Sequence, residues 1–324
     1  MLNSETILVS PLCKNITLEN HVIGYKEEGE STVVFLKQDD SVILSMVIDS
    51  YQNTANETIE LLKNNSVNKI DYLVWTHPHK DHSEGIEILL TEFCNNNTKV
   101  IIPNIDTSNF GDIPDNCKDK YTNFSKINQN GKRKYGELIF GEYNKVIKNY
   151  NFTWNGEKID FRICCLSPTS KLLSNAKFNK YSSINDYSVA LVIIFNSLVF
   201  VYGADIENKA INSLLQNDVF LDNVVFIKAP HHGSHSTSNF FDIVNIKEDT
   251  VCTITNYING DIVLPEKNIL DEYDARSKEV YLFNNDIESE GFGIVSSSFS
   301  LYDIKNMIYD VNTSGLAYRY CNEK

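Results

Sequence analysis

The spacing of apolar and polar residues alternates along the chain between strand-like and helix-like patterns. In the N-terminal third, two β-branched runs joined by a polar turn predict a hairpin, and apolar residues three and four apart predict helices. Ser83 precedes one helical run and is expected to cap it. The predicted elements are a hairpin of 32–36 and 41–48, a helix over 56–64, a strand over 72–75, a helix over 83–93 and a strand over 99–102. This alternation favours a layered α/β fold.

A second ordered region begins near residue 159 and shows the same alternation. Its most apolar stretch, 189–204, is interrupted by Asn196 and Ser197 and is too short to cross a membrane as a helix, so it predicts two buried strands. The predicted elements are a strand over 159–166, a hairpin of 187–195 and 198–202, a helix over 206–215, a strand over 223–228, a helix over 237–244, a strand over 251–255, a helix over 265–273 and a strand over 280–283.

The segment from about 104 to 158 interrupts this pattern with polar residues and glycines. Because no repeat or linker separates the two ordered regions, we expect a single domain over 1–324 with this segment as a polar insertion. Between Lys118 and Lys148 it carries eight basic and three acidic residues, so it is locally basic. It is interpreted as a solvated insertion, with a basic arm that faces the substrate as the alternative.

Composition excludes several classes of protein. The 324 residues carry a formal net charge of −14, and 42% of them are hydrophobic, which is typical of a globular chain and not of a disordered or fibrous one. An acidic chain binds nucleic acid and anionic membranes poorly, so a polyanionic substrate would need a metal ion or a local basic patch. The seven cysteines include no Cys-x-x-Cys pair, and no signal peptide is visible, so a cytoplasmic location is expected.

Six of the seven histidines lie in two short clusters. His77, His79 and His82 follow the predicted strand 72–75, and the other three follow the predicted strand 223–228. The carboxyl ends of strands are where open α/β sheets hold their ligands. Histidines that were merely solvated would be scattered along the chain. The second cluster consists of His231, His232 and His235.

The first cluster has the spacing His-x-His-x-Asp-His, with Asp81 as its carboxylate. Imidazole and carboxylate groups suit Zn(II), Mn(II) or Fe(II). Four such donors within six residues cannot close on one ion without strain, so the spacing favours two neighbouring ions. A pair of ions about 3.5–4 Å apart activates a bridging water and clamps both oxygens of an in-line displacement.

Two further carboxylates stand at strand ends. Asp205 follows the predicted strand 198–202 and is the candidate bridge between the ions, or alternatively only the N-cap of the next helix. Asp49 follows the hairpin strand 41–48. It is interpreted as a residue that orients a ligand histidine, with a plain turn residue as the alternative.

These residues resemble a known family. The run from Thr76 to His82 resembles the signature motif of the metallo-β-lactamase fold superfamily, and 47–50 resembles its first motif. Asp205 falls where the family's bridging aspartate lies, and 229–234 falls at its last metal-binding histidine. The form Pro-His-His-Gly-Ser at 230–234, together with 185–188, resembles the ComEC-like branch. The resemblance covers roughly 30–283 and is most specific in the first histidine cluster.

The resemblance implies an αβ/βα four-layer sandwich of the metallo-β-lactamase type, with two divalent metal ions, Zn or Mn, in a cleft at one sheet edge. One ion would bind His77, His79 and Asp205. The other would bind Asp81, His82, Asp205 and one histidine of the second cluster, with His231 preferred and the reverse assignment left open. The expected catalytic residues are Asp81 and, for substrate phosphate or leaving-group protonation, His232 or His235. Residues expected to orient ligands or contact substrate are Asp49, Asp186, Ser188 and Ser234.

The chain departs from the family pattern in two places. Many members supply one more histidine to the first ion, but no histidine lies between His82 and His231, so Asp186, Asn185 or a water would replace it. Leu264 precedes Pro265 where ComEC-like proteins tend to have His-Pro. The membrane segments of ComEC are also absent, so DNA import is not implied.

These features predict a soluble metallo-hydrolase, foremost a phosphodiesterase or nuclease that acts on nucleic acid or a nucleotide. A metal pair would neutralise substrate charge that the acidic chain otherwise repels. One alternative is hydrolysis of an ester, lactam or thioester by the same bound hydroxide. Another is a metal-binding interaction module of a larger complex that has lost catalysis along with the missing histidine. No membrane partner is expected, and the sequence indicates no particular protein partner.

Overall fold

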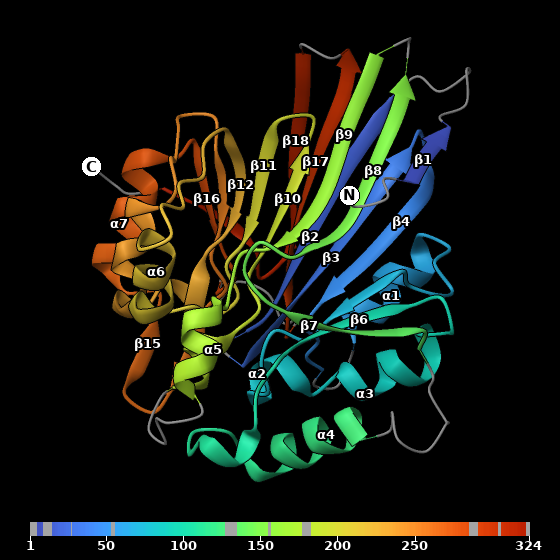
Figure 1. The fold of residues 1–324 in the computed structure, drawn as a ribbon. Coiled ribbons are helices and arrows are strands. Elements are labelled where there is room, and N and C mark those ends of the chain that lie inside the picture. The colour runs from blue at the N-terminus through green and yellow to red at the C-terminus, as the bar shows by residue number, and fades with distance from the viewer. Residues whose placement is uncertain are drawn as a thin grey trace.

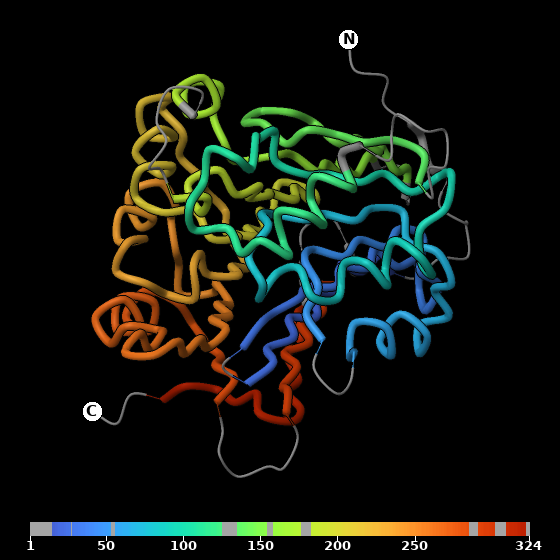
Figure 2. Tube along the Cα trace, turned by 90° about the horizontal axis from the view of Figure 1, so that it is seen from below, coloured from blue at the N-terminus to red at the C-terminus, as the bar shows by residue number. Residues whose placement is uncertain are grey.

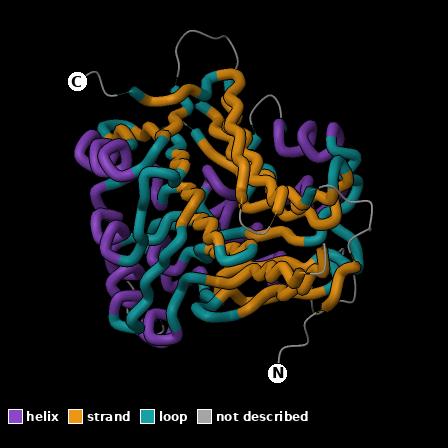
Figure 3. Tube along the Cα trace, turned by 90° about the horizontal axis from the view of Figure 1, so that it is seen from above, coloured by secondary structure: helices purple, strands orange, loops and turns teal. Residues whose placement is uncertain are grey.

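The computed structural model describes residues 5–8, 15–26, 28–52, 56–126, 135–154, 157–176, 183–284, 291–303 and 306–321. Within these ranges two large sheets face each other and helices cover their outer sides (Figure 1). Seen from above, the strands occupy the middle of the molecule and most helices lie at its margins (Figure 3). The predicted α/β class and the four-layer αβ/βα order are therefore both present.

The first sheet has eight strands among the described residues, in the order β18-β17-β2-β3-β4-β5-β6-β7. Strands β3, β4, β5 and β6 include the predicted hairpin and the two predicted strands that follow it. Pairing is antiparallel from β18 to β4 and parallel from β4 to β7. The strands are β2 (Ile16–Tyr25), β3 (Gly29–Gln38), β4 (Ser41–Ile48), β5 (Tyr72–Val74), β6 (Lys99–Pro103), β7 (Glu137–Gly141), β17 (Gly293–Asp303) and β18 (Asn306–Gly315).

The second sheet has nine described strands, in the order β1-β8-β9-β10-β11-β12-β13-β16-β19. Its middle strands β11, β12, β13 and β16 run parallel to one another. The strands are β1 (Glu5–Leu8), β8 (Val146–Trp154), β9 (Glu157–Cys165), β10 (Leu191–Phe195), β11 (Leu198–Tyr202), β12 (Val224–Lys228), β13 (Val251–Thr253), β16 (Glu279–Leu282) and β19 (Tyr318–Tyr320). A separate short hairpin consists of β14 (Tyr257–Asn259) and β15 (Ile262–Leu264).

Three apolar clusters hold these layers together. The central one lies between the sheets and joins residues such as Leu36 and Met46 of the first sheet to Phe200 and Phe226 of the second. A second cluster packs α5, α6 and α7 on the outer face of the second sheet, and a third packs α1, α3 and α4 on the outer face of the first. The helices are α1 (Glu57–Asn64), α2 (Lys80–Ser83), α3 (Ile86–Ile88), α4 (Asp115–Lys126), α5 (Ser170–Ala176), α6 (Asn208–Leu215) and α7 (Lys267–Arg276).

Three features differ from the sequence prediction. The helix expected to start after Ser83 starts earlier, at Lys80, and is broken into α2, α3 and a π-helical turn over Leu89–Phe93. Strand β2 and the long β17–β18 hairpin were not predicted. Figure 2 shows why they matter, because the red C-terminal strands run beside the blue N-terminal ones and complete the first sheet.

The weakly patterned segment 104–158 contributes α4 and strands to both sheets, including β7 at the edge of the first sheet and β8 in the second. Of its basic residues, Lys132, Arg133 and Lys134 lie outside the described residues. None of the described helices has both the length and the apolarity needed to cross a membrane.

Candidate metal centre

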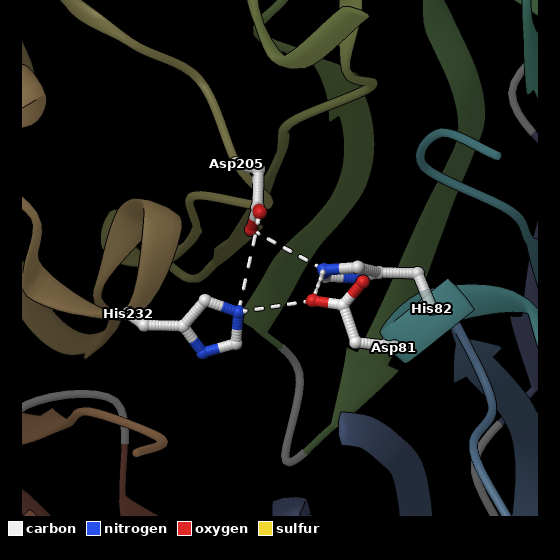
Figure 4. Close-up of side chains that lie close together, drawn as sticks. All are labelled: Asp81, His82, Asp205 and His232. Atoms are coloured by element: carbon white, nitrogen blue, oxygen red, sulfur yellow. Dashed lines mark ion pairs between the residues drawn. The ribbon is translucent and has the colours of Figure 1, made fainter. Parts of the chain in front are cut away.

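The two histidine clusters and the two strand-end aspartates lie at the same edge of the sandwich. Asp49 follows β4 and the first cluster follows β5, while Asp205 follows β11 and the second cluster follows β12. Within each of these pairs the two strands are parallel neighbours, so their carboxyl ends point the same way. Figure 4 shows that Asp81 and His82 on α2 point toward Asp205 and His232 from the other sheet.

Local hydrogen bonds shape the first cluster. Asp49 accepts from the Thr76 backbone N–H at 2.7 Å and from the Thr76 hydroxyl at 2.6 Å, which fixes the chain immediately before His77. Ser83 accepts from the Trp75 indole N–H at 3.0 Å and donates to the carbonyl of His79. Ser83 is therefore not the N-cap that the sequence predicted. It lies in the last position of α2 and ties this turn back to β5.

Close backbone contacts shape the second cluster. Gly203 donates its backbone N–H to the Lys228 carbonyl at 3.0 Å, and His231 donates to the Ala204 carbonyl at 2.8 Å. A Cβ at Gly203 would lie 2.8 Å from the backbone nitrogen of Pro230, so only glycine allows this approach. Ala204, His231 and His232 have φ values of 48°, 44° and 52°. Left-handed backbone costs a non-glycine residue about 1–3 kcal/mol and tends to occur at functional sites.

Asp205 does not cap the helix that follows it. α6 begins at Asn208 with Glu207 in the N-cap position, so the capping alternative for Asp205 is wrong. The Asp205 side chain is instead 2% exposed and faces the histidines, with no hydrogen bond to its Oδ1 among the described residues.

Four residues form the tightest group at this edge. Asp81 Oδ2 lies 3.3 Å from His82 Nε2 and 3.4 Å from His232 Nε2. Asp205 Oδ1 lies 3.4 Å from His82 Nε2, and its Oδ2 lies 4.0 Å from His232 Nε2 (Figure 4). The four ligand atoms lie within 4.8 Å of one another. Two carboxylate oxygens, one from each aspartate, and two imidazole nitrogens from distant segments thus face a common centre.

Groups behind the imidazoles fix their orientation. Nδ1 of His82 lies 2.7 Å from Asp49 Oδ2, and Nδ1 of His232 lies 3.0 Å from the Thr255 hydroxyl. In both rings Nδ1 is occupied on the outer side, which leaves Nε2 toward the centre. Metal-binding histidines generally show this arrangement, because the outer partner sets the tautomer and the ring plane.

His77 and His79 lie beside this group. His77 Nε2 lies 3.1 Å from His79 Nδ1 and 3.8 Å from Asp205 Oδ2. The Nδ1 of His77 is 3.0 Å from the Thr76 hydroxyl, which donates to Asp49. His77 therefore lies next to Asp205, and His79 lies next to His77.

The second cluster separates into three positions. His232 is 1% exposed and belongs to the four-residue group. His231 lies at the same edge, with Nε2 4.0 Å from Asp205 Oδ2. His235 is exposed, its Nδ1 lies 3.1 Å from the Asn268 amide, and it does not line the cavity described below. The geometry thus puts His232, not His231, next to Asp81 and His82, and it puts His235 away from the centre.

The other predicted site residues vary in position. Asp186 accepts from the Ala210 N–H of α6 at 3.2 Å and lies 3.7 Å from Lys209. Ser188 is fully buried, and its hydroxyl makes no hydrogen bond among the described residues. Ser234 lines the cavity and accepts from the Ser236 hydroxyl at 3.0 Å.

The buried histidines and aspartates of the centre shift one another's pKa values. Burial would lower the pKa of His82, but the carboxylates of Asp205, Asp81 and Asp49 raise it well above the ordinary value. Burial would raise the pKa of Asp81 and Asp205, but the His82 imidazolium holds both well below their usual range. Burial lowers the pKa of His77 far enough to keep that ring neutral. Without a metal, a proton on His82 supplies the positive charge that the two carboxylates need.

The centre opens into a cavity of about 600 Å³. Its walls combine residues of both histidine clusters with the β14–β15 hairpin. The Tyr257 ring stacks on the His232 ring, with centroids 5.1 Å apart and planes 24° apart. The lining residues are His79, Lys80, Asp81, Asp112, Pro114, Asn185, Asp205, His231, His232, Ser234, Tyr257, Asn259, Ile262, Leu264 and Glu266.

Several residues of the centre were not predicted from the sequence. Glu30 lies 2.5 Å from the Lys228 ammonium and 3.4 Å from His232 Nδ1, and both members of this ion pair are buried. Thr255 donates to Glu30 and contacts His232. Glu207 contacts His231 at 3.1 Å. Each is a single polar residue without a local motif. The one signal in the sequence was Lys228, a charged residue at the end of an otherwise apolar predicted strand.

The residues present fit a divalent metal. His82 Nε2, His232 Nε2 and Asp205 Oδ1 are buried and make no hydrogen bond among the described residues. Buried polar atoms are normally satisfied, and three unsatisfied atoms that face one point indicate a missing cation. Neighbouring ligands bound at 2.0–2.1 Å in a tetrahedron lie about 3.3 Å apart, which matches the 3.3–3.4 Å separations found here.

Comparisons with known proteins give only distant similarities. No protein-family model matches the chain, and no curated protein matches it. A mutant of the CmlA β-hydroxylase is 14% identical with a TM-score of 0.35, over 66% of this chain and 35% of that one. A diphosphatase from the PhnP family is 12% identical with a TM-score of 0.35, over 72% of this chain and 85% of that one. The chain thus spans about a third of the length of the hydroxylase. The description of its fold rests on the strand order and apolar clusters given above, not on these similarities.

Proposed function

We propose that this chain is a metallo-hydrolase of the metallo-β-lactamase fold superfamily, in or near its ComEC-like branch, that cleaves a phosphodiester in a small substrate such as a nucleotide. The observation that carries the proposal is the convergence of three buried, unsatisfied atoms on one point, namely His82 Nε2, His232 Nε2 and Asp205 Oδ1. Asp205 and His232 also line an open cavity, so the centre is accessible to substrate, as a catalytic metal site requires.

In this proposal two divalent ions, Zn or Mn, would share Asp205 as a ligand. His77, His79 and Asp205 would hold the first ion, and Asp81, His82, His232 and Asp205 would hold the second. When bound, the ions would supply a hydroxide nucleophile at neutral pH and neutralise charge on the phosphate.

The chain's own groups position this centre. Asp49 and Thr255 hold the Nδ1 atoms of His82 and His232, so that both Nε2 atoms face inward. Asp205 and Asp81 are ionised and nearly buried, so they need no proton release before they bind a cation. Lys80 stands at the cavity wall, where its ammonium can pair with a phosphate oxygen.

The cavity favours a small substrate over a polymer. Apart from the proposed ligands and His231, its charged lining consists of Lys80 against Asp112 and Glu266. That balance does not attract a long polyanion. Its volume of about 600 Å³ lies in the range typical of small-molecule sites.

The contacts of the basic segment 118–148 also argue against a polymer substrate. Lys120 lies 3.5 Å from Glu84, Lys145 donates to the Phe140 carbonyl, and Lys148 lies over the Tyr150 ring. None of these three residues lines the cavity. The apolar wall of Tyr257, Ile262 and Leu264 instead offers a surface to an aromatic base.

The test supplies Zn(II) and Mn(II) in parallel to protein stripped with a chelator. Substrates are bis(p-nitrophenyl) phosphate, cyclic and linear nucleotides, single-stranded DNA and RNA, and p-nitrophenyl acetate. We expect metal-dependent cleavage of the diester and of at least one nucleotide, faster than that of the polymers. Asp81→Asn should abolish turnover, whereas Asp271→Asn on the exposed face of α7 should not change it.

The other outcomes contradict the proposal in distinct ways. Cleavage of the acetate ester without the diester would indicate a carbonyl hydrolase. Tight metal binding without turnover on any substrate would indicate an interaction module. Faster cleavage of DNA or RNA than of nucleotides would overturn the small-substrate assignment.

A further inference from the structure

The proposed first ion has an incomplete set of protein ligands. His77, His79 and Asp205 give it three, and the sequence between His82 and His231 contains no further histidine. His231 is the unassigned imidazole of the cavity wall. Its Nε2 lies 4.0 Å from Asp205 Oδ2, the same oxygen that lies 3.8 Å from His77 Nε2.

The outer side of the His231 ring is held like those of His82 and His232. Its Nδ1 lies 3.1 Å from Glu207 Oε1 and 3.2 Å from the Ser236 hydroxyl. Nδ1–H therefore donates to Glu207, and Nε2 carries the lone pair. This carboxylate–imidazole pair repeats the one that Asp49 forms with His82.

Asn185 completes this arrangement. Its amide nitrogen donates to Glu207 Oε1 at 3.2 Å and lies 3.2 Å from His231 Nε2. Its carbonyl oxygen is buried and makes no hydrogen bond among the described residues. Without a metal, the Asn185 amide meets the lone pair of His231 that a cation would take.

The backbone separates the two adjacent histidines. His231 and His232 both have left-handed φ and ψ, at 44° and 50° and at 52° and 23°. Their ring centroids are 6.3 Å apart with planes 62° apart, while both Nε2 atoms lie 4.0 Å from Asp205 Oδ2. The two rings therefore reach Asp205 from different directions. His232 belongs to the four-residue group, and His231 does not.

We propose that His231 is the fourth protein ligand of the first ion, in place of the histidine that the chain lacks, and that Glu207 is its positioning residue. The inference rests on the proposed metal centre. The separations of 3.8 and 4.0 Å exceed the tetrahedral ligand spacing of about 3.3 Å by less than 1 Å. Rotation of the histidine side chains would have to bring the remaining donors together, because His77, His79 and His231 belong to none of the described groups whose donor atoms all lie within 4.8 Å of one another.

The test measures metal content directly and does not need a substrate. The full chain is stripped with a chelator, titrated calorimetrically with Zn(II) and analysed for bound metal after desalting. We expect two ions in the unaltered protein and one in His231→Ala. Mn(II)-loaded protein should show the exchange-coupled electron paramagnetic resonance signal of a pair, and His231→Ala should show that of an isolated ion.

Glu207→Gln separates ligation from a general structural effect. We expect it to weaken the affinity of one ion by about 10–100-fold and to leave the other ion unchanged. The matched control is Glu266→Gln, because Glu266 lines the same cavity but accepts from the backbone N–H of His235. It should keep both affinities.

Two ions with unchanged affinity in His231→Ala would overturn the inference and leave the metal centre intact. If that variant also lost turnover, His231 would be a proton donor and not a ligand. If His231→Ala fails to fold, unchanged affinities in Glu207→Gln would overturn the inference. An unaltered chain that binds no metal would refute the proposed function itself, and the inference with it.

Discussion

Asp49 Oδ2 lies 2.7 Å from Nδ1 of His82, although 33 residues separate the two in the sequence. The same carboxylate accepts from the backbone and hydroxyl of Thr76. One aspartate thus fixes both the start of the first histidine cluster and the ring at its end. Burial raises the pKa of Asp49, and the neighbouring His82 and Thr76 offset part of that rise.

The first prediction concerns this carboxylate. Asp49→Asn replaces one acceptor oxygen by an amide, so His82 loses the charge that orients its ring. We expect metal affinity to fall by about 10–100-fold, as measured by competition with a chromophoric chelator. Asp71→Asn is the control, because Asp71 accepts from the Ser45 N–H and hydroxyl at the other end of the same strands. An equal loss in both variants would contradict a specific role for Asp49.

Asp186 makes stability depend on pH. Burial and the nearby Glu207 carboxylate raise its pKa from 3.8 to about 6. Because the folded state holds this proton more tightly than the unfolded state does, the ionised group destabilises the fold above pH 6, and the cost disappears as the pH falls toward 4. Asp186→Asn should therefore increase the free energy of unfolding at pH 7.5 by at most about 3 kcal/mol.

Urea unfolding of both proteins at pH 7.5 and pH 4.5 checks this prediction. The stabilising effect of Asp186→Asn should shrink at the lower pH, where the native acid is largely protonated. A difference that is the same at both pH values would show that the carboxylate's charge is not the cause.

The buried pair of Glu30 and Lys228 supports the centre from behind. Burial would raise the pKa of Glu30, but the Lys228 ammonium 2.5 Å away lowers it overall. Lys228→Met leaves that carboxylate buried without its cation, and we expect a loss of about 3–5 kcal/mol in unfolding free energy. The double variant with Glu30→Gln should recover most of it.

The exposed pair of Lys247 and Asp222 provides a matched comparison at 3.0 Å. Lys247→Met should cost less than about 1 kcal/mol, because solvent screens this pair. Similar losses for the two lysine variants in chemical denaturation would mean that burial of the Glu30 pair has no energetic consequence.

Gly203 controls how closely Asp205 approaches the second histidine cluster. Gly203→Ala would set a Cβ 2.8 Å from the backbone nitrogen of Pro230, and backbone atoms cannot move aside cheaply. We expect a loss of about 1–3 kcal/mol in stability and weaker binding of metal. Gly111→Ala, with no atom within 4 Å of its added Cβ, should change neither. Full metal content in Gly203→Ala would show that this close approach is dispensable.

The sequence predicted the strands that carry the site because each is a short apolar run with its own boundaries. It predicted that histidines of the two clusters would lie at one edge because His77 to His82 and His231 to His235 are contiguous and each cluster follows a strand. Strand β2 was missed because Glu19, Asn20 and His21 interrupt its apolar pattern. Asn20 is buried only because Tyr202 and Ser297, both far away in sequence, supply its hydrogen bonds.

The supporting residues could not be found in the same way. Glu30, Glu207 and Thr255 are single polar residues whose roles depend on which strand ends meet in the folded protein. Asp49 likewise acts on Thr76 from another strand. The division of work between His231 and His232 depends on two left-handed backbone conformations, which no residue type in that turn specifies.

The most direct test of the metal centre is anomalous X-ray scattering from crystals of the full chain grown with Zn(II), recorded on both sides of the zinc absorption edge. Two peaks should flank the carboxylate of Asp205, one beside His77 and the other beside His232. An absence of peaks between the Thr76–His82 and Pro230–His235 turns, with zinc bound elsewhere or not at all, would contradict the account.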